Sequence, residues 1–231
     1  MQIYLDNAAT TKMSKTAINA MLPYMDGIYG NPSSLHSAGQ KANEALVCAR
    51  EQIAKCIGCT AKEITFTSGG SEADNQAIIS AASIGERKGK KHIISTAFEH
   101  HAVLNTLKKL EKKGFEITLL DVHENGIIYP EQVSNAIRDD TCLVTVMYAN
   151  NEIGTIQPIK EIGQICREKG VLFHTDAVQA AGHLHINVNE QNIDMLSLSA
   201  HKFKGPKGIG ALYARRGTIL TNIIDGGAQE R

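Results

Sequence analysis

The sequence predicts an α/β protein in which a mostly parallel sheet lies between two layers of helices. Short apolar segments alternate along the chain with segments of helical period, and this alternation is typical of parallel strands joined by helices. The short segments are apolar throughout rather than at every second residue, as strands buried on both faces are. Glycine-rich and polar turns separate most of the segments, which supports the same division.

The first 57 residues come before this alternation. Turn-forming residues dominate 6–11 and 30–34, and a short helical pattern lies between them over 17–25. From residue 40 to residue 57 apolar residues recur at intervals of three and four, which predicts an amphipathic helix.

The remaining elements follow from the same two patterns. Strands are expected at 64–67, 92–96, 115–122, 142–148, 171–175, 193–198 and 209–214. Helices are expected at 71–84, 100–113, 130–138 and 159–169. Pro130 stands at the start of its helix, where proline is tolerated, and Gly170 follows the end of the last one.

Composition excludes several classes of function. Lys plus Arg equals Asp plus Glu, 24 against 24, so no overall charge attracts nucleic acid or an acidic membrane. Tryptophan is absent, which argues against a platform for stacking bases. The N-terminus has no signal-peptide pattern and no apolar run reaches the length of a membrane span. We therefore expect a cytoplasmic protein that binds neither nucleic acid nor membrane.

The five cysteines show no disulfide pattern. Cys56 and Cys59 form a CxxC sequence, but no second pair or zinc-spaced histidines accompany it. We expect these two to be structural thiols at a helix end and expect no metal site. Cys142 and Cys166 lie in apolar patterns and are predicted core residues, and Cys48 likewise has no feature of an activated nucleophile.

Ligands of open α/β sheets bind where the strands end at their carboxyl edge. The strand at 64–67 is followed by Ser68, Gly69, Gly70 and Ser71 and then by a helix. Free N–H groups at such a helix start can bind phosphate, although a plain turn with a serine cap has the same pattern. The segment matches neither the nucleotide P-loop nor the dinucleotide fingerprint.

The next two strands also end in polar residues. His100 follows the strand at 92–96, where an imidazole could stack on a planar ligand, shuttle a proton or simply cap the helix. Asn151 follows the strand at 142–148 together with Asn150 and Glu152. An amide there could orient a polar substituent of a ring, or the segment could merely close an Asx turn.

Asp176 and Gln179 follow the strand at 171–175, three residues apart, so one helical turn would put them on one face. A buried carboxylate needs a cationic partner, and a protonated pyridine nitrogen would be one, while an N-cap aspartate is the simpler alternative. The strand at 193–198 runs into Ser199, His201 and Lys202. A lysine with a lowered pKa there could form a Schiff base, although most loop lysines are only solvated.

Together these residues supply a phosphate site, a stacking imidazole, a partner for a ring nitrogen and an amine for an imine. Pyridoxal 5'-phosphate requires this set. The chain resembles the cysteine desulfurases of the NifS/IscS group, which belong to the class V aminotransferase family and are pyridoxal enzymes of fold type I. The motifs of that group occur here in the same order along the chain. The matching motifs are Tyr4-Leu-Asp-Asn-Ala-Ala-Thr-Thr11, Gly30-Asn-Pro-Ser-Ser34 with His36, Thr67-Ser-Gly-Gly-Ser-Glu72, Glu99-His100, Asn150-Asn-Glu-Ile-Gly154, Ser199-Ala-His-Lys202, Gly205-Pro-Lys-Gly208 and Gly226-Gly-Ala-Gln-Glu-Arg231.

The resemblance implies a role for each candidate residue. Lys202 would carry the cofactor and move the α-proton of the substrate, and His100 would stack on the ring and assist the proton transfer. Asp176 would pair with the ring nitrogen. The remaining cofactor contacts would be Gln179 at the phenolate oxygen, Asn151 beside the ring, and Gly70, Ser71, Ser199 and His201 at the phosphate.

The resemblance also implies a homodimer that converts L-cysteine to L-alanine and an enzyme persulfide. The sulfur would pass to an acceptor or scaffold protein for iron–sulfur clusters. Residues 1–15 would be an arm that packs on a small C-terminal domain, and residues 16–231 the large cofactor-binding domain. The small domain and its persulfide cysteine would be absent, so this chain alone would not transfer sulfur. A selenocysteine lyase, another class V lyase and a non-catalytic dimerisation or binding module remain alternatives.

Overall fold

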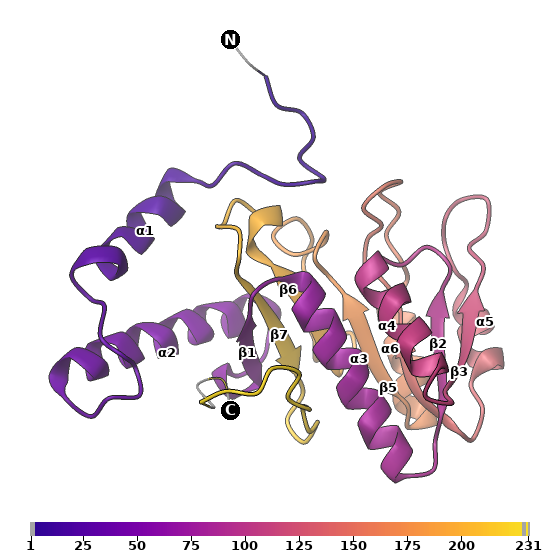
Figure 1. Ribbon diagram of the computed structural model, residues 1–231. Coiled ribbons are helices and arrows are strands. Elements are labelled where there is room, and N and C mark those ends of the chain that lie inside the picture. Colours follow the sequence, from indigo (N-terminus) through magenta and orange to yellow (C-terminus); the bar gives the residue numbers. More distant parts are fainter. Residues whose placement is uncertain (1–2, 228–229, 231) are drawn as a thin grey trace.

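The computed structural model describes residues 3–227 and 230. Within them one seven-stranded sheet has the order β1-β7-β6-β5-β4-β2-β3 (Figure 1). Its strands are β1 (Ile64–Thr67), β2 (His92–Thr96), β3 (Glu116–Leu120), β4 (Thr141–Thr145), β5 (Leu172–Asp176), β6 (Met195–Ser199) and β7 (Gly210–Ala214). All neighbours from β3 to β6 pair in parallel, whereas β7 is antiparallel to β6 and to β1. The predicted mostly parallel sheet is confirmed.

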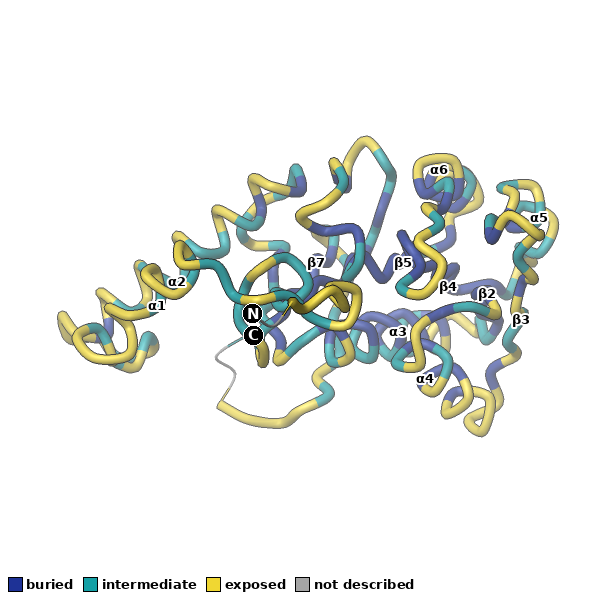
Figure 2. The backbone as a smooth tube through the Cα atoms, turned by 90° about the horizontal axis from the view of Figure 1, so that it is seen from above, coloured by how far each residue is buried: buried dark blue, intermediate teal, exposed yellow. Residues whose placement is uncertain are grey.

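Helices cover both faces of this sheet. They are α1 (Lys15–Asp26), α2 (Ser37–Ile57), α3 (Gly70–Arg87), α4 (His101–Glu111), α5 (Pro130–Ala136) and α6 (Ile159–Lys169). Figure 2 shows α3 and α4 on one side of the sheet and α5 and α6 on the other. Two separate apolar clusters match this division: one contains residues of α3 and α4, and the other contains residues of α5, α6 and the end of α2. The three-layer architecture follows from this double covering.

Several boundaries differ from those that the patterns predict. Helix α2 begins at Ser37 rather than near residue 40, because the Nδ1 of His36 accepts a hydrogen bond from the backbone of Gly39 at 3.3 Å. Strand β4 ends at Thr145, although the apolar run continues. The backbone N–H groups of Val146 and Tyr148 still bond to β5, so the run remains buried beside the sheet without regular pairing.

Helices α1 and α2 extend away from the body of the molecule (Figure 1). Helix α1 has no buried residue, and α2 buries only Gly39, Ala54 and Ile57. Large apolar side chains of this region, among them Leu22, Met25, Tyr29 and Leu35, are exposed. No helix in the described ranges has both the length and the apolar character needed to cross a membrane.

The topology brings the carboxyl ends of six strands to one edge. Strands β2 to β6 are parallel, and β1 runs the same way because both β1 and β6 are antiparallel to β7. This edge, at the top of Figure 1, is where ligands of such sheets bind.

Candidate active site

A cavity of about 450 Å³ opens at the carboxyl edge of the sheet, within the range of small-molecule sites. All nine residues predicted from the sequence line it: Gly70, Ser71, His100, Asn151, Asp176, Gln179, Ser199, His201 and Lys202. They come from five junctions between a strand and the segment that follows it. The structure therefore brings together residues that are up to 132 positions apart, from residue 70 to residue 202.

The start of α3 forms one wall of the cavity. Its first residue, Gly70, lies so close to the chain after β5 that an added Cβ would stand 2.6 Å from Cγ2 of Val178. The first N–H groups of this 18-residue helix are oriented as a helix N-terminus presents them to an anion. Glu72 does not compete for the site, because its Oε2 accepts a hydrogen bond from the backbone of Ser68 at 2.7 Å. With Ser199 and His201 on the facing side, this wall fits a phosphate group.

Lys202 ends a short 3-10 helix, Ala200–Lys202, directly after β6. Its Nζ donates hydrogen bonds to the carbonyl oxygens of Ala8, at 2.5 Å, and Ala9, at 3.0 Å. Burial lowers the pKa of Lys202, while the carboxylates of Asp176 and Asp6 oppose this shift. This amine lines a cavity and is held by two backbone carbonyl groups, and the lowered pKa increases its neutral, nucleophilic fraction. Its role as the Schiff-base lysine stays a prediction.

Asp176 is the last residue of β5 and is 2% exposed. Its Oδ1 accepts a hydrogen bond from the backbone of Val178 at 2.9 Å, so the chain turns here in an Asx turn rather than in a helix. Burial raises the pKa of Asp176, and the Val178 N–H, His100 and Lys202 oppose the rise. Gln179 also lines the cavity, with its Nε2 bonded to the carbonyl oxygen of Ala8 at 2.9 Å.

His100 and Asn151 complete the opposite wall. His100 is exposed and also caps α4, since its Nδ1 accepts a hydrogen bond from Ala102 N at 3.1 Å. The capping and cavity-lining interpretations of this residue are thus compatible. The Asx turn expected in this loop is made by Asn150, whose Oδ1 accepts from the backbone of Glu152 at 2.8 Å. Asn151 itself is left to face the cavity.

The sequence interpretation missed Asp74, a further side chain of this cavity. It is 1% exposed, and its Oδ1 has no hydrogen-bond partner among the described residues. One side-chain ligand atom each of Asp74, His100 and Asp176 lie within 4.8 Å of one another. These atom types could hold a cation, whereas the adjoining amine and helix N-terminus favour an anionic ligand. Helical period could have identified Asp74, because it follows Gly70 by four residues on the same face.

The N-terminal arm was also missed as part of the site. Asp6, Ala8 and Ala9 line the cavity, and Thr11 fixes the arm through its hydroxyl, which donates to the carbonyl oxygen of His201 at 2.7 Å. The arm therefore contacts the large domain. Its predicted packing on a small domain stays a prediction, and residues 1–2 of the arm and 228–229 and 231 of the last motif lie outside the described residues.

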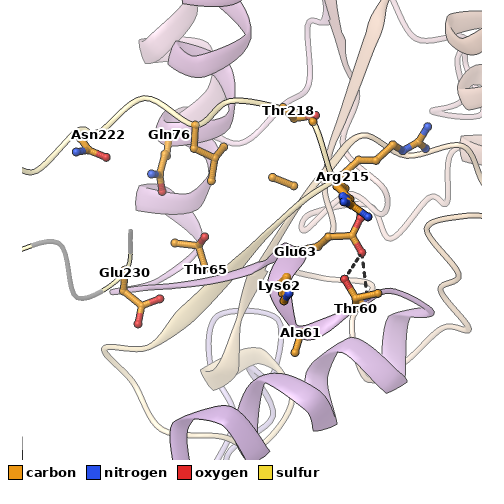
Figure 3. A pocket seen from close by; sticks show the side chains of 14 residues that line it. Thr60, Ala61, Lys62, Glu63, Thr65, Gln76, Arg215, Thr218, Asn222 and Glu230 are labelled. Carbon is orange, nitrogen blue, oxygen red and sulfur yellow. Dashed lines mark hydrogen bonds between the residues drawn. The ribbon is translucent and has the colours of Figure 1, made fainter. Parts of the chain in front are cut away.

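A larger cavity, of about 960 Å³, lies at the opposite edge of the sheet (Figure 3). Its two acidic residues are bound to the chain itself. The carboxylate of Glu63 accepts hydrogen bonds from the backbone and hydroxyl of Thr60 and from the backbone of Arg216. Glu230 pairs with Arg50 at 2.5 Å. The neighbouring Arg215 pairs with Asp194 at 3.3 Å. Because these charges stabilise the fold and the cavity lies away from the carboxyl edge, it does not compete as the active site.

The family model described as Aminotransferase class-V matches residues 3–228. The chain belongs to the class-V aminotransferase family. The family predicted from the motifs is thereby confirmed. Cysteine desulfurase IscS of Clostridium botulinum (strain Hall) is 54% identical to this class-V aminotransferase chain over 230 residues, which are 100% of this chain and 58% of that protein. The chain thus spans somewhat more than half the length of this relative.

Solved structures agree with this assignment. A NifS-like protein superimposes with a TM-score of 0.96 at 40% identity, covering 100% of this chain and 64% of that one. A structure described as SspA in complex with cysteine gives a TM-score of 0.95 at 44% identity, covering 99% of this chain and 66% of that one. The predicted fold of this class-V aminotransferase is that of the NifS-like enzymes, and it is confirmed.

Proposed function

We propose that this chain is the cofactor-binding part of a cysteine desulfurase that uses pyridoxal 5'-phosphate. One observation carries the proposal: a partly buried lysine amine and a buried carboxylate face one cavity, which the N-terminus of a long helix closes on a third side. Lys202 and Asp176 are the two groups, and α3 is the helix. An aldehyde, a ring nitrogen and a phosphate are the three features of the cofactor that such groups bind.

Two features of the chain fit this cofactor: a space in the cavity wall and a buried carboxyl group. Gly70 leaves the wall open where a Cβ would fill it, and Asp176 offers a buried charge that a protonated ring nitrogen would neutralise. We assign the phosphate to Gly70, Ser71, Ser199 and His201, the phenolate oxygen to Gln179, and the space beside the ring to Asn151 and His100. When bound, the cofactor withdraws electrons from the Cα of an amino acid and so makes its proton acidic.

Lys202 and His100 are the proposed catalytic residues. The lowered pKa of Lys202 increases the fraction of free amine that can hold the Cα proton and return it to the product. His100 is exposed and lines the cavity, and imidazole is the side chain that most often accepts and donates protons in catalysis. Both groups have backbone contacts that orient them, as proton transfer over hydrogen-bond distance requires.

L-cysteine is the proposed substrate, and the solved relative in complex with cysteine supports it. In the overall reaction the Cβ–S bond breaks, a proton takes the place of sulfur on the carbon, and a protein thiolate receives the sulfur as a persulfide. All five cysteines fall within the described residues, and none of them lines the cavity. We place the persulfide cysteine in the part of the relatives' length that this chain does not span, and we expect this chain alone to transfer no sulfur.

The proposed setting is that of a cytoplasmic homodimer that supplies sulfur for iron–sulfur clusters through an acceptor or scaffold protein. The exposed apolar residues of α1 and α2 support an interaction with another chain or domain, since monomeric proteins seldom leave large apolar patches open. Gel filtration with light scattering checks the dimer directly.

The purified chain mixed with pyridoxal 5'-phosphate tests the proposal. We expect a visible absorption band that resists dialysis, and we expect Lys202→Ala to abolish it. Lys169→Ala is the matched control, because Lys169 is exposed at the end of α6. An undiminished band in Lys202→Ala would refute the assignment. Addition of L-cysteine should change the wild-type spectrum, and a response to selenocysteine alone would favour a selenocysteine lyase instead.

A further inference from the structure

Two buried carboxyl groups from different elements meet on the floor of the cavity. Asp74, on α3, is 1% exposed and Asp176, at the end of β5, is 2% exposed. A side-chain oxygen of each lies within 4.8 Å of the other and of a ring nitrogen of His100. Two buried carboxylates at this separation repel each other strongly, so that one of them retains its proton.

The groups around Asp176 favour its charged form. The backbone N–H of Val178 donates to its Oδ1, and Lys202 and His100 both oppose the rise in its pKa that burial causes. Hydrogen bonds to a carboxylate and nearby positive charge stabilise the anion.

Burial and the neighbouring Asp176 favour the neutral form of Asp74 by raising its pKa, and they outweigh a hydrogen bond from the Ser197 side chain that lowers it. The nearest basic group to Asp74 is His174 on β5, whose Nε2 lies 3.7 Å from Oδ1. That imidazole is neutral, because burial lowers the pKa of His174 to about 3, and its nitrogens bond to hydroxyls of Thr145 and Ser197. The third buried carboxyl nearby, Glu99, is not a cation and acts to raise the pKa of Asp74.

The ring of His100 lies within 4.8 Å of both carboxyl groups, so it does not distinguish them. Asp176 has the Val178 N–H and Lys202 in addition, and Asp74 has neither of these contacts.

We propose that Asp74 is a positioning residue that shares one proton with Asp176, with Asp74 as the neutral acid and Asp176 as the anion. The two carboxyl groups have oxygens within 4.8 Å of each other. The retained proton would give Asp74, whose Oδ1 has no hydrogen-bond partner among the described residues, a donor to direct at Asp176. The proton stays within the pair, so no other reactant is needed. The consequence for the cofactor rests on the proposed function: Asp74 fixes one negative charge on Asp176, where the ring nitrogen would bind.

The first test uses the chain without cofactor and observes aspartate carboxyl carbons by ¹³C NMR across the pH range. The pair should titrate in two separate steps, as coupled acids do. In the Asp176→Asn variant the titration midpoint of Asp74 should fall by about one pH unit or more, because the repelling charge of Asp176 is gone. An unchanged Asp74 step in that variant would overturn the shared proton.

Two substitutions of Asp74 distinguish positioning from mere packing. In the Asp74→Ala variant the titration midpoint of Asp176 should rise by about one pH unit, because the hydrogen-bond donor that the protonated Asp74 supplies is lost. In Asp74→Asn it should remain near the wild-type value, because the amide can still donate. Ser80→Ala is the matched control, since Ser80 is buried on the same helix and bonds only to Gln76 and Thr221. Should Asp74→Ala fail to fold by circular dichroism, Asp176→Asn and Asp74→Asn carry the test.

The second test measures the dissociation constant of pyridoxal 5'-phosphate by absorption. We expect Asp74→Ala to weaken binding about tenfold, and Asp74→Asn and Ser80→Ala to leave it within about twofold. Equal affinity in Asp74→Ala and wild type would overturn the positioning role even where NMR shows a shared proton. Failure of the wild type to bind the cofactor would instead refute the proposed function and leave the NMR result standing.

Discussion

His174 should make the free energy of unfolding of the chain depend on pH below neutrality, and a single substitution of His174 should remove this dependence. It is fully buried on β5, and burial lowers its pKa from 6.5 to about 3. In the unfolded chain the imidazole keeps its ordinary pKa, so between these two values the unfolded state binds more protons. The contribution of His174 to stability is therefore complete above pH 6.5 and is lost as the pH falls toward 3.

The size of this effect follows from the two pKa values. At pH 5 the unfolded imidazole lies 1.5 pH units below its pKa, and at 1.36 kcal/mol per unit this amounts to about 2 kcal/mol of lost stability. His174→Gln has no titrating ring, so the free-energy difference between wild type and variant should shrink by about 2 kcal/mol from pH 7.5 to pH 5.

Urea unfolding followed by far-ultraviolet circular dichroism measures this difference, since the chain has no tryptophan for fluorescence. Working with the difference cancels the pH dependence of the other groups. A difference that does not change between the two pH values would refute the neutral histidine. Because His174 lies 3.7 Å from Asp74, that result would also indicate an ionised Asp74 paired with a charged imidazole.

Two further predictions concern the walls of the cavity. Gly70→Ala should weaken binding of pyridoxal 5'-phosphate about tenfold, or about 1.4 kcal/mol, because its Cβ would stand 2.6 Å from Cγ2 of Val178. The double variant Gly70→Ala, Val178→Ala should recover most of the affinity. If it does not, the contact with Val178 is not the cause of the loss. Glu99→Gln should stabilise the chain at neutral pH, because burial raises the pKa of Glu99 in the native state to about 8. The wild type therefore loses stability as the pH rises from about 4.5, where the unfolded carboxyl ionises, toward 8. Urea unfolding should show wild type losing about 3 kcal/mol relative to Glu99→Gln between pH 4.5 and pH 7, and parallel pH profiles would contradict this.

The sequence predicted the strands well because most of them are buried on both faces. Each of β2, β4, β6 and β7 is buried at every position, so an uninterrupted apolar or small-residue run marks it. Strand β3 is the exception: it lies at the sheet edge, with Glu116 and Leu119 exposed, and its predicted bounds were too long. The antiparallel direction of β7 and the strand order depend on tertiary contacts that local patterns do not contain.

The candidate site was predictable to the extent that it stands at strand ends. All nine predicted residues stand at the carboxyl end of a strand or in the segment that follows it, so a rule about where ligands bind was sufficient to select them. Asp74 lies inside a helix, where this rule does not select it, although its spacing of four residues from Gly70 could have placed it on the same helix face. The contacts of Ala8 and Ala9 with Lys202 span more than 190 residues, and no local pattern could have indicated them.

The bonds between the N-terminal arm and Lys202 have a consequence for how occupancy of the cavity could be observed. A protonated amine has three N–H groups, and here the carbonyl oxygens of Ala8 and Ala9 use two of them. A double bond from this nitrogen to an aldehyde carbon leaves at most one N–H, so at least one of the two bonds to the arm is lost, while Thr11 remains attached to His201. Residues 6–9 would then be held less firmly than residue 11. Hydrogen exchange or limited proteolysis at residues 6–9 thus reports on chemistry at Lys202, almost 200 positions away in the chain.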